Sequence, residues 1–355
     1  MRTMEKLANK LGSVYTKYGY LPYTMSKFEE YELYLRNKDF LISDRVLTFT
    51  DTDGRLMALK PDVTLSIIKN TTDIPGSVQK VFYLENVYRP GKNDHGFREI
   101  MQVGLECMGA VDAYCIFEVL LLAATSLREI SDSYVLDVSH MGLVSRLLDE
   151  AGLEDPSRGQ VLEAIGNKNS HEIREICEEC GVSGEKLVRL SQIYGNVHVV
   201  MPALEEIFGD APELVQLKGL LTALDSAAAG CVNVDFSVVN DMNYYNGIVF
   251  RGFVEGIPEG VLSGGQYDGL MRKMGRKGKA IGFALYPDLL ERFNCQPEQT
   301  ADAVLYYDSE ADVLTVARAV ESLTEKGIRV QAQPNREETV EKKRFRLVGD
   351  AIEAI

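Results

Sequence analysis

Strand patterns on both sides of a long helical stretch constrain this fold more than any other feature of the sequence. Over about 139–230, apolar residues recur at helical spacing between turn residues. Runs rich in strand-forming residues precede this stretch at 81–89 and 99–108, and others follow it at 232–239 and 248–254. The sequence therefore predicts one β-rich domain that is interrupted by a helical insertion.

Apolar periodicity and turn signals predict the remaining elements of this domain. They are a helix at 4–18, a hairpin at 47–59 that turns at Asp53-Gly54, a turn-rich loop at 90–96, a helix at 112–130, and a glycine-rich loop at 263–269. Ser139 is placed to cap the first helix of the insertion.

A domain boundary is expected near 294–300. Beyond it, the pattern predicts a strand at 303–307, a helix at 309–326, a strand at 328–332 and a final helix at 336–355. We therefore expect a core domain at 1–294, with its helical insertion at about 139–230, and a short α/β piece at 301–355.

Charge and hydropathy narrow the class of protein. The 355-residue chain has 53 acidic and 38 basic residues, which gives a net charge of −15. Nucleic-acid-binding proteins normally present a basic face, so RNA or DNA is not expected as the main partner. No apolar run approaches the roughly 20 residues that span a bilayer. The chain begins with an amphipathic pattern rather than a signal peptide, and we expect a cytoplasmic protein without membrane association.

Cysteine and histidine spacing gives little support to a metal site. Cys177 and Cys180 are the only close pair among six cysteines, and they lie in a charged helical stretch without a second pair. Reduced thiols are the simpler interpretation, and zinc or redox chemistry is the less favoured alternative. The four histidines show no metal-ligand spacing, so neither a metal nor a cofactor is expected.

Three polar stretches carry the candidate site. The first, Lys60-Pro-Asp62-Val-Thr64, places a carboxylate and a hydroxyl two residues apart, on one face if the segment is extended. Such a pair suits an α-ammonium group. An alternative of equal weight is that Asp62 caps a helix at 65–69.

The second stretch runs from Arg89 to Glu106. Gln102 and Glu106 are four residues apart, so they share one face of the predicted strand at 99–108. Burying these polar groups among apolar neighbours is costly unless a partner binds them, which points to a ligand. A solvated strand face is the alternative.

The third stretch combines Tyr244-Tyr245 with the segment Ser263-Gly-Gly-Gln-Tyr-Asp-Gly269. A tyrosine offers a hydroxyl and a flat ring, and paired glycines let the backbone approach a ligand closely. Core packing of the tyrosines and a plain tight turn at the glycines are the alternatives.

The order of these motifs resembles the catalytic core of class II aminoacyl-tRNA synthetases, and of histidyl-tRNA synthetase in particular. The resemblance covers 1 to about 293, insertion included. It implies an α+β fold in which an antiparallel sheet is flanked by helices. The piece at 301–355 resembles the first half of the family's α/β anticodon-binding domain. A truncated version on an acidic chain implies that tRNA binding is not expected.

The same resemblance assigns roles to individual residues. It implies that Gln102 and Glu106 hold the amino group and imidazole of histidine, and that Tyr245 contacts the imidazole. Asp62 stands where the family carries the longer glutamate, and Arg89 is the cation of the second class II motif.

Two further cations of the family are missing from this sequence. Asn240 and Leu289 stand where the synthetase has arginines that contact the reacting phosphate and clamp ATP. Charge stabilisation of this kind is worth about 10³–10⁵ in rate, so the loss of both predicts no useful aminoacylation. Arg292 lies three residues beyond Leu289 and is the one candidate replacement.

Such a composition is similar to that of the inactive synthetase paralogues that serve as regulatory subunits of ATP phosphoribosyltransferase. This resemblance implies a regulatory role in the first step of histidine biosynthesis, a short-form catalytic subunit as partner, and histidine as feedback effector. It also implies self-association as a dimer within a hetero-octamer. The expected effector-binding residues, with no catalytic residue among them, are Asp62, Thr64, Arg89, Gln102, Glu106, Tyr244 and Tyr245.

Two rival functions are compatible with the same residues. One is an active histidyl-tRNA synthetase whose cations have shifted, and the other is a synthetase-like adaptor that binds an amino acid. The sequence does not establish whether histidine binds in the synthetase-like pocket or at a subunit interface.

Overall fold

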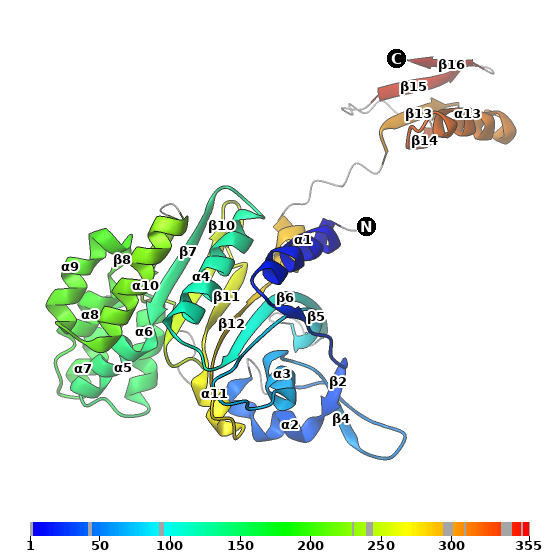
Figure 1. Ribbon diagram of the computed structural model, residues 1–355. Coiled ribbons are helices and arrows are strands. Elements are labelled where there is room, and N and C mark those ends of the chain that lie inside the picture. The colour runs from blue at the N-terminus through cyan, green and yellow to red at the C-terminus, as the bar shows by residue number, and fades with distance from the viewer. Residues whose placement is uncertain are drawn as a thin grey trace. The chain divides into compact units, whose positions relative to one another are not determined.

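The computed structural model describes residues 3–41, 45–91, 96–228, 231–238, 244–293, 301–308, 310–334, 343–348 and 351–354. The chain forms two compact units, Met1–Phe293 and Asn294–Ile355 (Figure 1). Each unit has its own sheet and is described by itself.

A mixed, mainly antiparallel sheet organises the larger unit. Among the described residues its strand order is β1-β5-β6-β12-β11-β10-β7-β9-β8. The bounds are β1 Leu21–Pro22, β5 Val78–Pro90, β6 Phe97–Gly109, β7 Tyr134–His140, β8 Tyr194–Gly195, β9 Val232–Asp235, β10 Ile248–Val254, β11 Leu262–Gln266 and β12 Lys279–Leu285. Only the β1–β5 and β7–β9 pairs are parallel within the described part. The expected α+β fold with a central sheet flanked by helices is confirmed.

Helices α1 (Thr3–Lys17) and α4 (Ala113–Arg128) cover one face of this sheet (Figure 1). Their apolar stripes join the sheet in the main core, as the 3.6-residue period of both segments predicts. Tyr15 and Ser126 join the two helices through a buried hydrogen bond of 2.8 Å between their hydroxyls. This face is closed by side chains, so a ligand site has to lie elsewhere.

The opposite face carries a second core and smaller elements. They are the hairpin strands β3 (Thr48–Thr50) and β4 (Leu56–Leu59) with β2 (Phe28–Glu30), the helices α2 (Tyr31–Arg36), α3 (Thr64–Asn70) and α11 (Asp268–Lys273), and the short 3-10 helix η1 (Lys38–Phe40). Helix α12 (Pro287–Phe293) instead packs against the main core through Leu290. Leu65, Ile67 and Ile68 of α3 are fully buried in the second core. Helix α3 therefore forms a fixed wall above the sheet.

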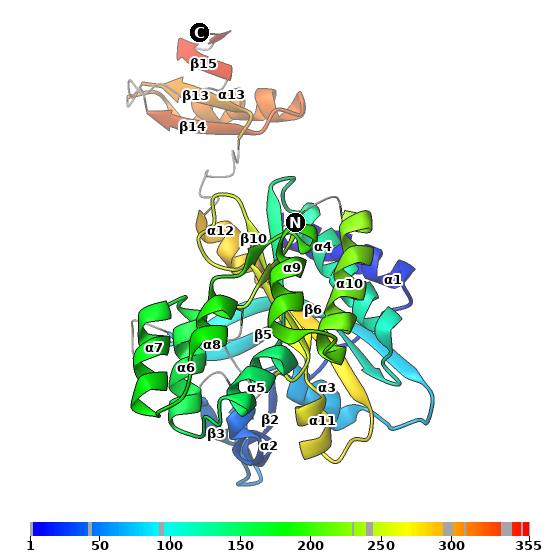
Figure 2. The ribbon, with the colours of Figure 1, turned by 90° about the vertical axis from the view of Figure 1, so that its left-hand side faces the viewer.

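Helices α5–α10 form the insertion (Figure 2). Their bounds are α5 Met141–Glu150, α6 Ser157–Gly166, α7 Ser170–Glu179, α8 Glu185–Ser191, α9 Val197–Phe208 and α10 Pro212–Ala228. The predicted cap of the first helix is wrong. His140, the last residue of β7, is the N-cap and accepts a hydrogen bond from the Gly142 backbone N–H at 3.0 Å, whereas Ser139 lies one residue earlier in the strand and pairs with Val249.

The smaller unit is an α/β piece with strand order β14-β13-β15-β16 in its described part. Its bounds are β13 Ala303–Tyr307, α13 Val313–Glu325, β14 Val330–Pro334, β15 Lys343–Val348 and β16 Ala351–Ala354. The predicted final helix at 336–355 is wrong. Phe345 and Leu347 alternate with charged residues, and this period of two suits a strand that pairs with β13.

The predicted glycine-rich loop at 263–269 is also largely a strand, because Leu262–Gln266 is β11, in the interior of the sheet. Its glycines are there because the sheet is crowded. A Cβ on Gly264 would overlap the Gly282 carbonyl oxygen, and one on Gly265 would lie 2.7 Å from the Tyr245 ring. Glycine in a strand marks close approach of this kind.

Strand register places two rows of side chains on the open face. One row crosses the sheet through Glu106, Gly282, Gly265 and Val249. The next row on the same face contains Tyr83, Gly104, Ala284, Ser263 and Arg251. Small residues in the middle of both rows hollow the floor, between Glu106 and Val249 in one row and between Tyr83 and Arg251 in the other.

We expect Gly282→Ala to destabilise the protein by about 1–3 kcal/mol. The added Cβ would overlap Glu106 Oε2 and lie 2.5 Å from the Leu105 carbonyl oxygen, which is fixed in the sheet. Urea unfolding measures the change. Gly219→Ala is the matched control, because a Cβ there meets nothing within 4 Å in α10, and it should stabilise by about 0.5–1 kcal/mol. Equal stability of Gly282→Ala and wild type would contradict the crowded floor.

Candidate functional site

A cavity of about 400 Å³ lies over the hollow part of the sheet. This volume is within the range of about 300–1,000 Å³ that small-molecule sites have. All seven residues predicted from the sequence line it: Asp62, Thr64, Arg89, Gln102, Glu106, Tyr244 and Tyr245. The fold thus brings the three sequence stretches together, and the ligand of these residues stays a prediction.

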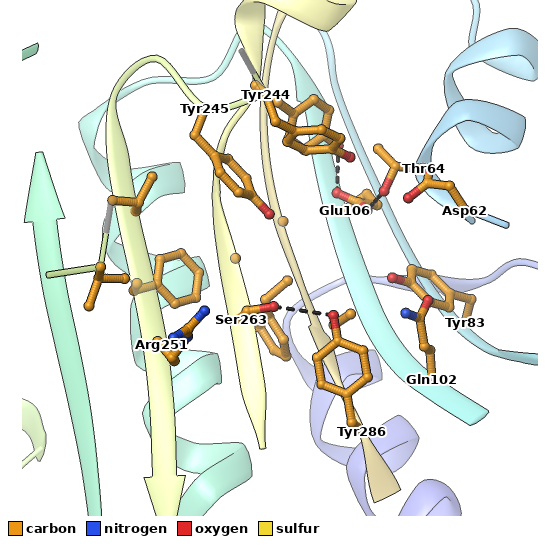
Figure 3. A pocket seen from close by; sticks show the side chains of 18 of the residues that line it. Asp62, Thr64, Tyr83, Gln102, Glu106, Tyr244, Tyr245, Arg251, Ser263 and Tyr286 are labelled. Carbon is orange, nitrogen blue, oxygen red and sulfur yellow. Dashed lines mark hydrogen bonds between the residues drawn. The ribbon is translucent and has the colours of Figure 1, made fainter. Parts of the chain in front are cut away.

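Glu106 is the buried centre of the pocket. Its side chain is 2% exposed and its carboxylate accepts hydrogen bonds from the Thr64 hydroxyl at 2.8 Å and the Tyr267 hydroxyl at 2.5 Å (Figure 3). Burial raises the pKa of Glu106 to about 8, because the charged form loses its water, although the two hydrogen bonds oppose this. The carboxyl group is therefore poised to exchange a proton near neutral pH.

The capping alternative for Asp62 is confirmed, and its binding of an ammonium group stays a prediction. Asp62 lines the pocket, and its Oδ1 atom accepts the Leu65 backbone N–H at 2.9 Å, which caps α3. The segment is not extended, because Val63 is helical at φ −89° and ψ −41°, so the one-face arrangement that an extended segment would give does not apply. Burial raises the pKa of Asp62, and the nearby Arg89 guanidinium opposes the shift.

Aromatic side chains form another wall of the pocket. The Tyr244 ring centroid lies 4.7 Å from that of Tyr245 and 5.9 Å from that of Tyr267. Tyr245 also contacts both hydrophobic cores, so the core-packing alternative is partly correct. The segment 239–243, which includes Asn240, lies outside the described residues.

Five further polar residues of the pocket lining are not among the seven predicted ones: Tyr83, Arg251, Ser263, Tyr267 and Tyr286. Ser263 and Tyr267 were visible as parts of the glycine-rich motif. Arg251 was visible as a charge inside the apolar run Ile248–Val254. Tyr286, whose hydroxyl lies 3.2 Å from the Ser263 hydroxyl, gives no signal in the sequence.

Leu289 does not belong to the pocket lining. It lies on α12, is partly buried, and packs against the main core. An apolar side chain that contacts the core thus stands where the sequence resemblance predicts the ATP-clamping arginine of a synthetase. The side chain of Arg292 is outside the described part of the structure.

The described residues contain no cluster of three or more histidine, cysteine or acidic side chains that could hold a metal ion. Cys177 is buried and Cys180 is exposed, and both are free thiols. No described helix combines the length and the apolar character needed to cross a membrane.

The raised pKa of Glu106 predicts a pH-dependent stability. Between about pH 4.5 and pH 8 the folded protein keeps a proton on Glu106 that the unfolded chain releases, so this group's contribution to stability falls as the pH rises. Glu106→Gln removes the effect. The difference in unfolding free energy between wild type and variant should change by of the order of 2 kcal/mol from pH 5 to pH 8.

Urea unfolding across this pH range measures that difference. Glu163→Gln in α6 is the control, because it removes an exposed carboxylate of the same kind. Parallel pH profiles for wild type and Glu106→Gln would show that Glu106 titrates at its ordinary value.

Comparisons with known proteins agree with this geometry. Residues 1–290 match the histidyl-tRNA synthetase family. An ATP phosphoribosyltransferase regulatory subunit from a Thermoanaerobacter species is 30% identical over 293 residues, which cover 79% of this chain and 76% of that protein. A second one, from Clostridium kluyveri, is 27% identical over 349 residues, covering 91% and 87% of the two chains.

Solved structures show the same fold. A structure from Bacillus halodurans, described as an ATP phosphoribosyltransferase regulatory subunit/histidyl-tRNA synthetase, superposes with a TM-score of 0.71 at 21% identity, covering 96% of this chain and 92% of that one. A chain of an ATP phosphoribosyl transferase complex from Thermotoga maritima gives 0.65 at 20% identity, covering 81% and 97%. The chain therefore belongs to the family that histidyl-tRNA synthetases share with the regulatory subunits of ATP phosphoribosyltransferase.

Proposed function

We propose that this chain is an ATP phosphoribosyltransferase regulatory subunit that binds histidine in the Glu106 pocket and controls a separate catalytic subunit. One observation carries the proposal. The pocket keeps the polar groups that suit an amino acid, whereas Leu289 occupies an ATP-contact position with a side chain that packs in the core. The names of the relatives in two species support the same assignment.

Histidine recognition uses the acidic end of the pocket. The imidazole lies against Glu106, whose pKa of about 8 lets the pair share a proton near neutrality. Tyr245 covers the ring from the aromatic wall, and Asp62 and Gln102 hold the α-ammonium group. Glu106 and Asp62 are held in place before the ligand arrives, since both are already hydrogen-bonded to the protein.

Regulation requires only a difference in affinity, not chemistry. An effector that favours one state of a complex shifts its partner by a coupling free energy of typically 1–3 kcal/mol. A short-form catalytic subunit would supply the reaction, in a hetero-oligomer that contains dimers of this chain. The Thermotoga maritima neighbour was solved as an ATP phosphoribosyl transferase complex, which supports an assembly of this kind.

Histidine sensitivity of a reconstituted complex tests the regulatory role. We expect the short-form catalytic subunit to co-purify with this chain and to lose activity when histidine is added. Glu106→Gln should weaken inhibition by about 10- to 100-fold in histidine concentration, because it removes a charge-assisted contact, and should still co-purify. Glu163→Gln should behave as wild type. Failure of the wild-type chain to bind the catalytic subunit would refute the assignment.

Pyrophosphate exchange with histidine and ATP tests for synthetase activity. We expect no exchange above background, because the loss of one charge-stabilising group costs about 10²–10³ in rate and two are absent from their family positions. A Leu289→Arg variant should remain inactive, since Asn240 is also changed in this sequence. Robust exchange by the wild-type chain would mean that the protein is an active histidyl-tRNA synthetase.

A further inference from the structure

A second charged group lies at the end of the pocket remote from Glu106. Arg251 comes from β10, and Figure 3 shows its guanidinium nitrogens beside Ser263. The side chain is half-buried and lines the same cavity. Gly260 makes room for it, because a Cβ there would lie 2.7 Å from the Arg251 Cγ and Cδ atoms. The Arg251 side chain is therefore packed against the protein rather than free on its surface.

Arg251 makes no hydrogen bond and no ion pair with any described residue. Its register partner across the strand pair is Asp137, an acidic residue on the same face of the sheet. The pKa of Asp137 is nevertheless raised to about 6 by burial and by Asp235, and Arg251 opposes this only weakly. A firm ion pair would lower that pKa instead. The guanidinium therefore retains its hydrogen-bonding capacity for something else.

Arg89, the other arginine in the pocket lining, already interacts with groups of the protein. Its Nε atom donates a hydrogen bond of 2.8 Å to the Pro61 carbonyl oxygen, and its charge acts on Asp62. It stands at the acidic end, where the ammonium group is expected. An anionic group of the ligand is therefore better placed at the opposite end of the pocket, beside Arg251.

The spacing of the two ends fits a single amino acid. The Glu106 carboxylate lies over Gly282 in β12, and Arg251 stands on β10, two strands away. Neighbouring strands are about 4.8 Å apart, so the two strands are separated by about 10 Å. That distance accommodates a small zwitterion with a hydrogen bond at each end.

We propose that Arg251 binds the α-carboxylate of the pocket's amino-acid ligand, while the Glu106 end holds its cationic groups. This inference rests on the proposed binding of histidine in the pocket. It assigns the carboxylate to a residue of β10, a different element from the segment at 239–243 in which the synthetase carries its arginine. Ser263, the cross-strand neighbour of Arg251, offers a second donor to the same anion.

Calorimetric titration of the full-length chain with histidine and with histidinol, which lacks the carboxylate, tests this assignment. It is done with the chain alone and with the short-form catalytic subunit. We expect the wild type to prefer histidine by about 10- to 100-fold, because a charge-assisted pair is lost with histidinol. Arg251→Gln should bind both ligands with the affinity that wild type has for histidinol, and Arg251→Lys should keep part of the preference.

The controls distinguish a failure of this inference from a failure of the proposed function. Arg174→Gln removes an exposed arginine of α7 and should retain the full preference. The preference is a ratio within each variant, so a general loss of stability does not imitate the result. Histidine binding with an unchanged preference in Arg251→Gln overturns the role of Arg251 alone. No histidine binding by the wild type overturns the proposed effector as well. Arg251-dependent binding of AMP, with histidine unaffected, would assign the arginine to a phosphate instead.

Discussion

The buried carboxyl group of Glu106 is the interaction on which the pocket depends. Burying a carboxyl group is expensive unless donors meet it, and here the donors come from α3 and from the turn before α11. Thr64 and Tyr267 lie 42 and 161 positions from Glu106 in the sequence, and both are thereby held at one point on β6. Gly282 makes this possible, because any side chain there would displace the carboxylate. The buried position of Glu106 therefore requires glycine at position 282.

The features of the fold and the pocket that the sequence predicts are those set by residues close together along the chain. Local signals gave the long strands and helices, and the motifs gave seven residues that share one cavity. The register of β6, β12, β11 and β10 is a long-range property, and no local period encodes it. For that reason the glycine-rich pattern predicts a loop where β11 lies, and nothing local points to Tyr286. The final strands do carry a local signal, the alternation of apolar and charged residues around Phe345, which favours a strand over the predicted helix.

The ionisable residues of the pocket are arranged to match a zwitterion, with acidic groups at one end and a basic group at the other. Glu106 and Asp62 stand at one end, and Arg251 stands at the other across two strands. A synthetase needs further cations to stabilise charge that develops at phosphorus, and such groups matter only in the transition state. A sensor needs only ground-state contacts. The placement of Leu289 in the core is thus compatible with a scaffold that retained binding while it lost the groups that serve catalysis alone.

Coupling from this pocket can begin at α3. Asp62 caps that helix through the Leu65 N–H, and it is also the group proposed to hold the ligand's ammonium. A ligand that draws on the same carboxylate acts directly on the first turn of a helix whose next residues are buried in the second core. A cap is worth about 0.5–2 kcal/mol, and an allosteric coupling typically 1–3 kcal/mol. The two magnitudes overlap, so the loss of this cap has the size of the coupling free energy that the proposed regulation requires.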